Sequence, residues 1–241
     1  MFLRSAFYAI LDYGTFLLYS VLNYRQASFI MNQKEEPWAW IRKLRDTVNA
    51  AESNCEQVLP AEILPWLYIS DEASALDTEK LQSLGITHVL SVNGAPRHRD
   101  RYIRDLYATH GITHKRVHGE DSEGYNMIEK HWEDCHAFLK QVQNDGSCKV
   151  VVHCVAGINR SGLITCAAHM IMEEASVLDV VKHCIDKRGP VLWNKSFQKQ
   201  LCLLAARNNL LGDKPEDTSD DPMEPERVPP PPRKAFDRLF H

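Results

Sequence analysis

The sequence lacks the marks of several large classes of protein. Its net charge is −4 and its pI about 6.3, so it has no excess of positive charge of the kind that a general nucleic-acid binder carries. Its seven cysteines are scattered and odd in number, and no Cys-x-x-Cys spacing indicates a zinc site. No internal repeat is evident. With 44% apolar residues in 241, the chain has enough hydrophobic material for one domain of ordinary size plus attachments.

A long uninterrupted hydrophobic run is also missing. Residues 2–22 come nearest, at about the twenty residues that a membrane helix needs. Asp12 lies at their centre, where an aspartate costs on the order of 3 kcal/mol, and no convincing cleavage site follows, so a secretory signal is not favoured. Three interpretations stay open for the leader over residues 1–32: an amphipathic helix that contacts a membrane, a helix packed on the domain, or a disordered segment.

The rest of the chain divides into three parts. Residues 33–57 contain apolar positions at helical spacing and predict one amphipathic helix over about residues 38–52. Residues 58–211 form the predicted globular domain. Residues 212–241 are rich in Asp, Glu and Pro, which predicts disorder. The basic and aromatic end of this tail, residues 233–240, is either a docking peptide for a partner or an inert end.

Alternating strand and helix patterns in the domain predict an α/β fold, with a mostly parallel central sheet of about five strands flanked by helices. Strands are predicted at residues 66–69, 86–92, 113–117 and 150–152. Helices are predicted at residues 71–84, with Asp71 as its N-cap, and at about 128–143, 163–172, 177–186 and 197–210.

The chain is organised around residues 149–162. Residues 150–152 are all valine, which indicates a buried strand, and residues 163–172 are apolar nearly all round, which indicates a buried helix. A tight loop joins the two. A loop that opens a helix collects unpaired backbone N–H groups and the positive end of the helix dipole. Such a loop binds anions, above all phosphate.

Three side chains and one glycine adapt this loop to chemistry on phosphorus. Arg160 can grip two phosphate oxygens with its planar fork. Cys154 begins the loop, where cysteines titrate at roughly 3.5–7.5 instead of near 8.5. Ser161 can donate a hydrogen bond to the sulfur, and Gly157 permits a close approach of the backbone to an oxyanion. A thiolate beneath a bound phosphoryl group is a nucleophile aimed at phosphorus.

The sequence here resembles a known family. Residues 153–161 match in full the motif His-Cys-x-x-Gly-x-x-Arg-Ser of the cysteine-dependent protein phosphatases, and the resemblance is closest to the dual-specificity group. It covers about residues 59–210. It implies a loop between a central strand and a helix that carries a cysteinyl-phosphate intermediate, with no metal or other cofactor. The implied substrates are signalling proteins phosphorylated on tyrosine, serine or threonine.

The resemblance also assigns roles within the loop. It implies Cys154 as the nucleophile, with Arg160 and Ser161 as its catalytic partners, and His153 as the residue that holds the loop by hydrogen bonding. The phosphate is expected to bind Val155, Ala156, Gly157, Ile158, Asn159 and Arg160. Because a thiolate enzyme needs a reducing compartment, the expected location is the cytosol or nucleus.

Hydrolysis also needs a general acid to protonate the leaving oxygen. Asp121 is the best candidate, because it lies in the loop that leads into the helix before the central strand. Dual-specificity phosphatases are similar here, with an Asp, a short polar run, then an Asn that opens the helix, as Asn126 does in this chain. Glu120 and Glu123 stay open as alternatives. The ionised acid would activate water in the second step.

Three further groups of residues carry weaker hypotheses. The basic run of Arg97, Arg99, Arg101 and Arg104 is interpreted as a solvated loop, with a secondary anion site beside the pocket as the alternative. His110, His114 and His118 are four apart but not in a helical pattern, so they are interpreted as surface or strand histidines. Cys148 or Cys166 is a candidate for a disulfide with Cys154 on oxidation.

Two other functions stay open beside protein dephosphorylation. RNA 5′-phosphatases of the same superfamily share an Asn before the loop arginine, as in Asn159-Arg160, although they carry a larger basic surface than this acidic chain. A non-catalytic phosphate-binding adaptor is the second alternative, although such relatives typically replace the cysteine. The Trp-Pro-Asp loop of strict tyrosine phosphatases is absent, which favours a shallower pocket open to all three phosphorylated residues.

Overall fold

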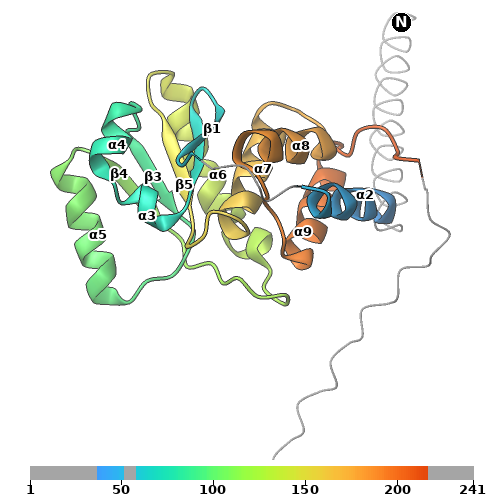
Figure 1. Cartoon of the computed structure of the whole chain (residues 1–241), viewed down its shortest axis with the longest axis horizontal. Helices are drawn as coiled ribbons and strands as arrows, with labels where there is room; N and C mark the ends of the chain where they lie inside the picture. The colour runs from blue at the N-terminus through green and yellow to red at the C-terminus, as the bar shows by residue number, and fades with distance from the viewer. Residues whose placement is uncertain (1–36, 52–57, 217–241) are drawn as a thin grey trace, which may run out of the picture.

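The computed structural model describes residues 37–51 and 58–216 (Figure 1). The leader over residues 1–32 and nearly all of the tail over residues 212–241 lie outside the described residues. The predictions of membrane contact, tail docking and domain boundaries therefore stay predictions. Within the described ranges, no helix is long and apolar enough to cross a membrane.

A five-stranded sheet forms the centre of the domain, in the order β1-β2-β5-β3-β4. The strands are β1 (Ala61–Leu64), β2 (Leu67–Ser70), β3 (His88–Ser91), β4 (Thr113–Arg116) and β5 (Val150–His153). All neighbours are parallel except β1 and β2. The predicted mostly parallel sheet is confirmed, although β1 was not foreseen. The three valines place β5 in the middle, buried on both faces.

Helices cover both faces of this sheet (Figure 1). One face carries α3 (Glu72–Ala75), α4 (Thr78–Ser83) and α5 (Arg97–Thr109) over a small apolar cluster. The other face carries the larger core, formed with α2 (Trp38–Asn49), α6 (Met127–Asp145), α7 (Arg160–Met172), α8 (Val177–Arg188) and α9 (Lys195–Arg207). The parallel strands place their carboxyl ends, and the loops that follow them, at one end of the molecule.

The helix α7 lies at the centre of the larger layer. Every residue from Ser161 to Met170 is buried, because α6, α8 and α9 pack around it. This confirms the interpretation of its all-round apolar sequence as a buried helix. The amphipathic helix α2 packs on α8 and α9 through Ile41, Leu44 and Val48.

Two predicted elements are wrong. The single helix over residues 71–84 is two short helices, because a second N-cap interrupts it. Asp71 accepts a hydrogen bond from Ser74 N at 2.8 Å, and Asp77 accepts one from Lys80 N at 3.0 Å.

The basic run over residues 97–104 is the second correction. It lies in the helix α5 and not in a loop, because Ile103 and Tyr107 provide an apolar stripe one turn apart that packs on the sheet. Charged residues surround this stripe in the sequence, which is why a solvated loop was predicted instead of a helix.

Candidate active site

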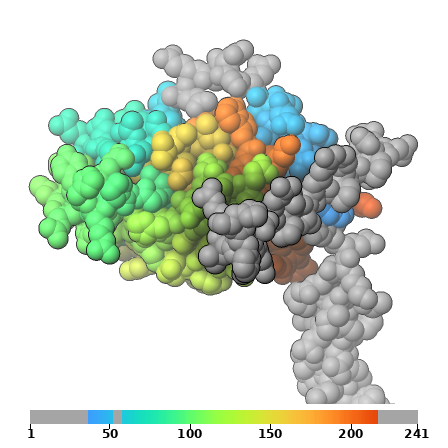
Figure 2. All heavy atoms as spheres, turned by 90° about the horizontal axis from the view of Figure 1, so that it is seen from below, coloured from blue at the N-terminus to red at the C-terminus, as the bar shows by residue number. Residues whose placement is uncertain are grey.

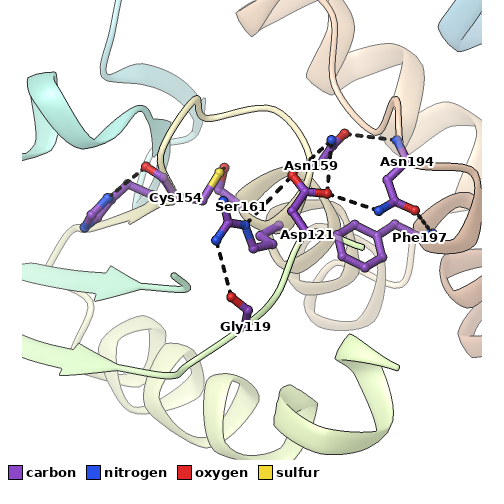
Figure 3. Close-up of polar contacts among 9 residues, drawn as sticks. Gly119, Asp121, Cys154, Asn159, Ser161, Asn194 and Phe197 are labelled. Carbon is purple, nitrogen blue, oxygen red and sulfur yellow. Dashed lines mark hydrogen bonds and ion pairs between the residues drawn. The ribbon is translucent and has the colours of Figure 1, made fainter. Parts of the chain in front are cut away.

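The loop between β5 and α7, residues 154–159, is the centre of the site; we call it the β5–α7 loop. It begins at Cys154, whose side chain is 1% exposed because the loop and the core enclose it. The sulfur lies 3.3 Å from the hydroxyl oxygen of Ser161 in the first turn of α7 (Figure 3). This contact brings together the predicted nucleophile and the predicted hydrogen-bond donor to it.

The carbonyl groups of the β5–α7 loop point away from its interior. Val155 O accepts a hydrogen bond from Glu72 N (3.1 Å) and Ile158 O accepts one from Leu192 N (3.1 Å). Ala156 O accepts one from Arg188 Nη2 at 3.0 Å. Because the C=O and N–H of one peptide unit point in opposite directions, the N–H groups that follow these carbonyls turn inward. Such convergent N–H groups form a cradle for an oxyanion.

Gly157 allows the loop to close this tightly. Its φ is +68°, a left-handed conformation that side chains other than hydrogen disfavour. A Cβ at this position would lie 2.7 Å from the carbonyl carbon and oxygen of Ser70 and 2.8 Å from Asp71 N. The contacting atoms are backbone and cannot move aside, so glycine is required here.

Asn159 is the residue before α7, yet its side chain does not cap the helix. Its Oδ1 instead accepts from Asn194 N at 3.0 Å. The N–H groups of the first turn of α7 are therefore left without a side-chain cap, and the positive end of the helix faces the loop. An anion bound in the loop can take the place of the missing cap.

Arg160 follows directly. Its Nη1 donates to Gly119 O at 3.3 Å, and its buried Nε has no hydrogen-bond partner among the residues that the structure describes. The same Nε lies 3.9 Å from Asp121 Oδ2, which is an ion-pair distance but not a hydrogen bond. A buried N–H group without a hydrogen-bond partner destabilises the folded protein. A phosphate oxygen that accepts from the Arg160 Nε would remove this cost.

Asp121 is brought to the edge of the loop, as predicted from its position in the sequence. Its Oδ1 accepts from Asn194 Nδ2 at 3.0 Å, and its Oδ2 accepts from Asn159 Nδ2 at 3.1 Å (Figure 3). Among the described residues, Glu120 and Glu123 have exposed side chains and make no hydrogen bond to the β5–α7 loop. The geometry thus favours Asp121 over its two rivals as the acid, although its role stays a prediction.

His153 supports the loop from below through a chain of hydrogen bonds. Its Nδ1 lies 3.2 Å from Cys154 O, an acceptor only, so Nδ1 carries the proton and Nε2 does not. Ser91 must then donate to His153 Nε2 (2.7 Å). The Ser91 oxygen in turn accepts from His114 Nε2 (2.9 Å). The proton positions of all three side chains are therefore fixed by one carbonyl group.

Burial keeps both histidines of this chain neutral. It lowers the pKa of His153 to about 4, against a weaker opposing effect of the Cys154 carbonyl. It also lowers the pKa of His114 to about 4, with a contribution from the positive charge of Arg116. Neither imidazole is protonated at neutral pH, which agrees with the hydrogen-bond directions.

These two histidines predict a loss of stability in mild acid. A histidine whose pKa is lowered on folding binds more protons when unfolded, so its contribution is full above pH 6.5 and is lost as the pH falls towards 4. Between pH 6.5 and 5 we expect His153 to remove about 2 kcal/mol from the free energy of unfolding, and the less buried His114 a smaller amount. Urea denaturation at the two pH values measures the loss. His114→Gln should reduce it, whereas the exposed control His98→Gln should not. An equal loss in all three proteins would contradict the assignment.

Three residues of the site were missed in the sequence. Arg188 is buried and braces the loop through Ala156 O and through Pro190 O at 2.9 Å. Burial lowers the pKa of its guanidinium, while Cys154 and Asp71 oppose this shift, so the cation lies within electrostatic reach of the nucleophile. Asn194 and Ser91 complete the set. In the sequence each resembles an ordinary helix end or strand residue, and no local signal separates them.

The weaker hypotheses have mixed outcomes. Arg99 pairs with Glu72 at 2.7 Å and Arg104 with Asp100 at 2.9 Å, so two of the four basic side chains of the run already have acidic partners. The secondary anion site stays a hypothesis. Cys166 is buried in α7, and Cys148, Cys154 and Cys166 are all free, so the disulfide of Cys154 on oxidation stays a prediction.

Comparisons with known proteins agree with this geometry. Residues 67–207 match the model of the dual specificity phosphatase catalytic domain, more than half of the chain. Human dual specificity protein phosphatase 26 is 31% identical over 146 residues, which are 61% of this chain and 67% of that protein. Residues 67–207, which match the family model, include the β5–α7 loop, Asp121 and Asn194.

A second relative and one solved structure extend the comparison. The Slingshot homolog protein phosphatase of Xenopus laevis is 30% identical over 142 residues, 59% of this chain, and the match spans about a fifth (19%) of that protein. The crystal structure of DUSP15 resembles this fold with a TM-score of 0.52 at 26% identity, and the match covers 62% of this chain and 92% of that one.

Proposed function

Because this chain belongs to the dual specificity phosphatase family, we propose that it hydrolyses phosphate esters on tyrosine, serine and threonine side chains of proteins through a cysteinyl-phosphate intermediate. One observation carries the proposal. Inward N–H groups, the Arg160 guanidinium and the Cys154 sulfur converge on one loop, with a carboxylate at its edge. The same chemistry requires a reducing compartment, so the proposal includes the cytosol or nucleus.

In the first step the Cys154 thiolate attacks phosphorus. The S–P bond forms as the P–O bond to the substrate side chain breaks, and the leaving oxygen takes its proton from Asp121. The loop N–H groups and Arg160 stabilise the charge on the three remaining phosphoryl oxygens. These fixed donors carry the charge, so the mechanism needs no metal ion.

In the second step water attacks the cysteinyl phosphate. Asp121, now ionised, accepts a proton from this water, the S–P bond breaks, and inorganic phosphate forms. Cys154 leaves as a thiolate, which the hydroxyl of Ser161 stabilises across the 3.3 Å contact. The enzyme returns to its starting state when phosphate dissociates, because Asp121 already carries the proton that it accepted from water.

The contacts of Asp121 suggest which of its oxygens carries the proton. Oδ1 accepts from two donors, Asn194 Nδ2 at 3.0 Å and Asn159 Nδ2 at 3.3 Å, whereas Oδ2 accepts from Asn159 Nδ2 alone, at 3.1 Å, and lies nearer Arg160. An N–H donor cannot share a lone pair with a proton, so the oxygen with fewer donors is the better place for it. We assign the transferred proton to Oδ2, the oxygen on the side of the loop.

Turnover by the full chain tests this proposal. We expect hydrolysis of para-nitrophenyl phosphate and of peptides of one sequence that carry phosphotyrosine, phosphothreonine or phosphoserine. Rapid acid quenching of a reaction with radiolabelled substrate should trap label on the protein. Phosphate release without trapped label at any time point would contradict the intermediate. Tight binding of the peptides without turnover would establish the adaptor instead.

The RNA 5′-phosphatase alternative depends on Asn159. The side chain of this residue is used within the protein, since its amide contacts Asp121 and its carbonyl contacts Asn194. These contacts give Asn159 a positioning role that needs no RNA. A 5′-triphosphorylated RNA in the same assay separates the two functions, because faster release from RNA than from every phosphopeptide would favour the alternative.

A further inference from the structure

Two exposed apolar side chains lie at the candidate active site. In the described part of the chain the large apolar residues with exposed side chains are Trp38, Val58, Tyr102, Val155 and Trp193. Val155, 54% exposed, follows the nucleophile directly, and Trp193, 53% exposed, lies in the segment between α8 and α9. On the face shown in Figure 2, this segment (orange) borders the region of the β5–α7 loop (yellow-orange).

The backbone on both sides of Trp193 is fixed to the site. Leu192 donates its N–H to Ile158 O at 3.1 Å and accepts from Gln198 Nε2 at 2.7 Å. Asn194 donates its N–H to Asn159 Oδ1 and its side-chain amide to Asp121 Oδ1, both at 3.0 Å. The indole is therefore carried by a segment with little freedom, directly between two residues that contact the loop and the acid.

Leu192 holds this segment in a strained conformation. Its φ is +60°, which residues other than glycine rarely adopt, and its side chain is fully buried. The strain coincides with an exposed indole immediately after it. Strained backbone of this kind persists where the surrounding contacts enforce it, and it gathers at functional sites. Here it directs the chain so that Leu192 is buried and Trp193 meets water.

The position of Trp193 relative to Asp121 identifies the part of a substrate that it can meet. Asp121 protonates the leaving oxygen in the proposed mechanism, so the remainder of the substrate extends from the site on the side of Asp121. Asn194, the neighbour of Trp193, contacts that carboxylate (Figure 3). Trp193 is therefore next in the chain to the residue that contacts the acid, on the side of the site from which the leaving group departs.

We propose, on the basis of the proposed function, that Trp193 determines specificity by contacting an apolar side chain next to the phosphorylated residue of an extended substrate. A rigid exposed tryptophan offers a large apolar surface at a low cost in conformational entropy. Val155 lines the opening of the loop and adds to the apolar rim. The preferred substrates are then phosphopeptides with a leucine or similar side chain beside the phosphorylated residue, in place of acidic or polar neighbours.

Matched peptides test this proposal. Two phosphothreonine peptides differ only in having leucine or serine on both sides of the phosphorylated residue. In the wild-type protein we expect KM for the leucine peptide to be about tenfold lower. Trp193→Ala should raise KM for the leucine peptide by about tenfold, with kcat within twofold, and leave the serine peptide unchanged. Trp193→Phe should retain most of the preference.

Two controls keep the outcome clear. Trp38→Ala removes the other exposed tryptophan, on α2, and should change neither KM. Hydrolysis of para-nitrophenyl phosphate should be the same in wild type and Trp193→Ala, which separates this proposal from the proposed function: a wild-type chain that hydrolyses nothing refutes the latter. Equal KM values for the two peptides in the wild type, or an equal fall of kcat on every substrate in Trp193→Ala, overturns the role of the indole in specificity.

Discussion

Replacing Cys154 by serine is expected to lower kcat for para-nitrophenyl phosphate by about 10⁴–10⁶-fold. A serine hydroxyl at this position stays protonated and is a much weaker nucleophile than a thiolate. The inward N–H groups, Gly157 and Arg160 belong to other residues, so the cradle for phosphate remains. We therefore expect the variant to bind a phosphopeptide as tightly as the wild type, or more tightly, when binding is measured by calorimetry.

Cys148→Ser is the matched control for this experiment. Cys148 is half-buried, precedes β5, and lies outside the β5–α7 loop. The same change of sulfur to oxygen there should leave kcat within about twofold, as expected of a substitution away from the site. Comparable losses in the two variants would show that a thiol is needed for folding and not for attack on phosphorus.

Replacing Asp121 by asparagine is expected to lower kcat on phosphothreonine peptides by about 10²–10⁴-fold. The side chains have nearly the same shape, but the amide has no acidic proton to give to the leaving oxygen, and its NH2 group can no longer accept from Asn159 or Asn194. The loss should be smaller on para-nitrophenyl phosphate, because nitrophenolate leaves readily without protonation. Steady-state kinetics on both substrates measure this difference.

Glu120→Gln and Glu123→Gln are the controls, since both carboxylates lie close in sequence but are turned to solvent. We expect kcat within twofold of the wild type for each. If Glu120→Gln were severely impaired and Asp121→Asn were not, the assignment of the acid would pass to Glu120. The contacts of Asp121 would then be structural, holding its loop against α9.

The centre of the site could be predicted because its signal is local. The valines of β5, the apolar sequence of α7 and the residues between them lie within about twenty positions, so strand, loop and helix constrain one another. Gly157 is a partial example: its approach to an oxyanion stays a prediction, and the contact with the Ser70 backbone is a second reason for glycine that the sequence did not indicate. Asp121 was predicted from its place in the loop before α6 and from Asn126, which opens α6 by accepting from Glu129 N at 3.4 Å.

The residues that brace the site could not be predicted, because their contacts depend on tertiary structure. Arg188 is 32 positions from Ala156 and Ser91 is 62 from His153, and nothing near either residue in the sequence indicates a polar partner. A buried arginine is rare, so the end of α8 was interpreted as an ordinary helix terminus. Only the packing of α8 against the loop shows that its last residue serves the loop.

The predictions for residues 71–84 and 97–104, on the smaller face, were wrong for a different reason. In residues 71–84 two capping aspartates compete, and the single long helix was predicted because only Asp71 was interpreted as an N-cap. In α5 only Ile103 and Tyr107 form the buried apolar stripe, and charged residues outnumber them. The high charge of the segment therefore favoured a loop over a helix in the prediction. Neither error moves a predicted catalytic residue, although Glu72 N at the start of α3 donates to Val155 O of the β5–α7 loop.

The docking of α2 has a practical consequence for any shortened version of this protein. The helix lies outside residues 67–207, the range that matches the family, yet Ile41, Leu44 and Val48 belong to the main core with α8 and α9. Truncation at residue 67 would remove α2 and expose the apolar surfaces of α8 and α9 to water. Arg188 is the last residue of α8, and Asn194 is the N-cap of α9. Such a fragment, which also lacks β1, should self-associate and lose the proposed activity, whereas a chain that begins at residue 37 should be monodisperse and as active as the full chain.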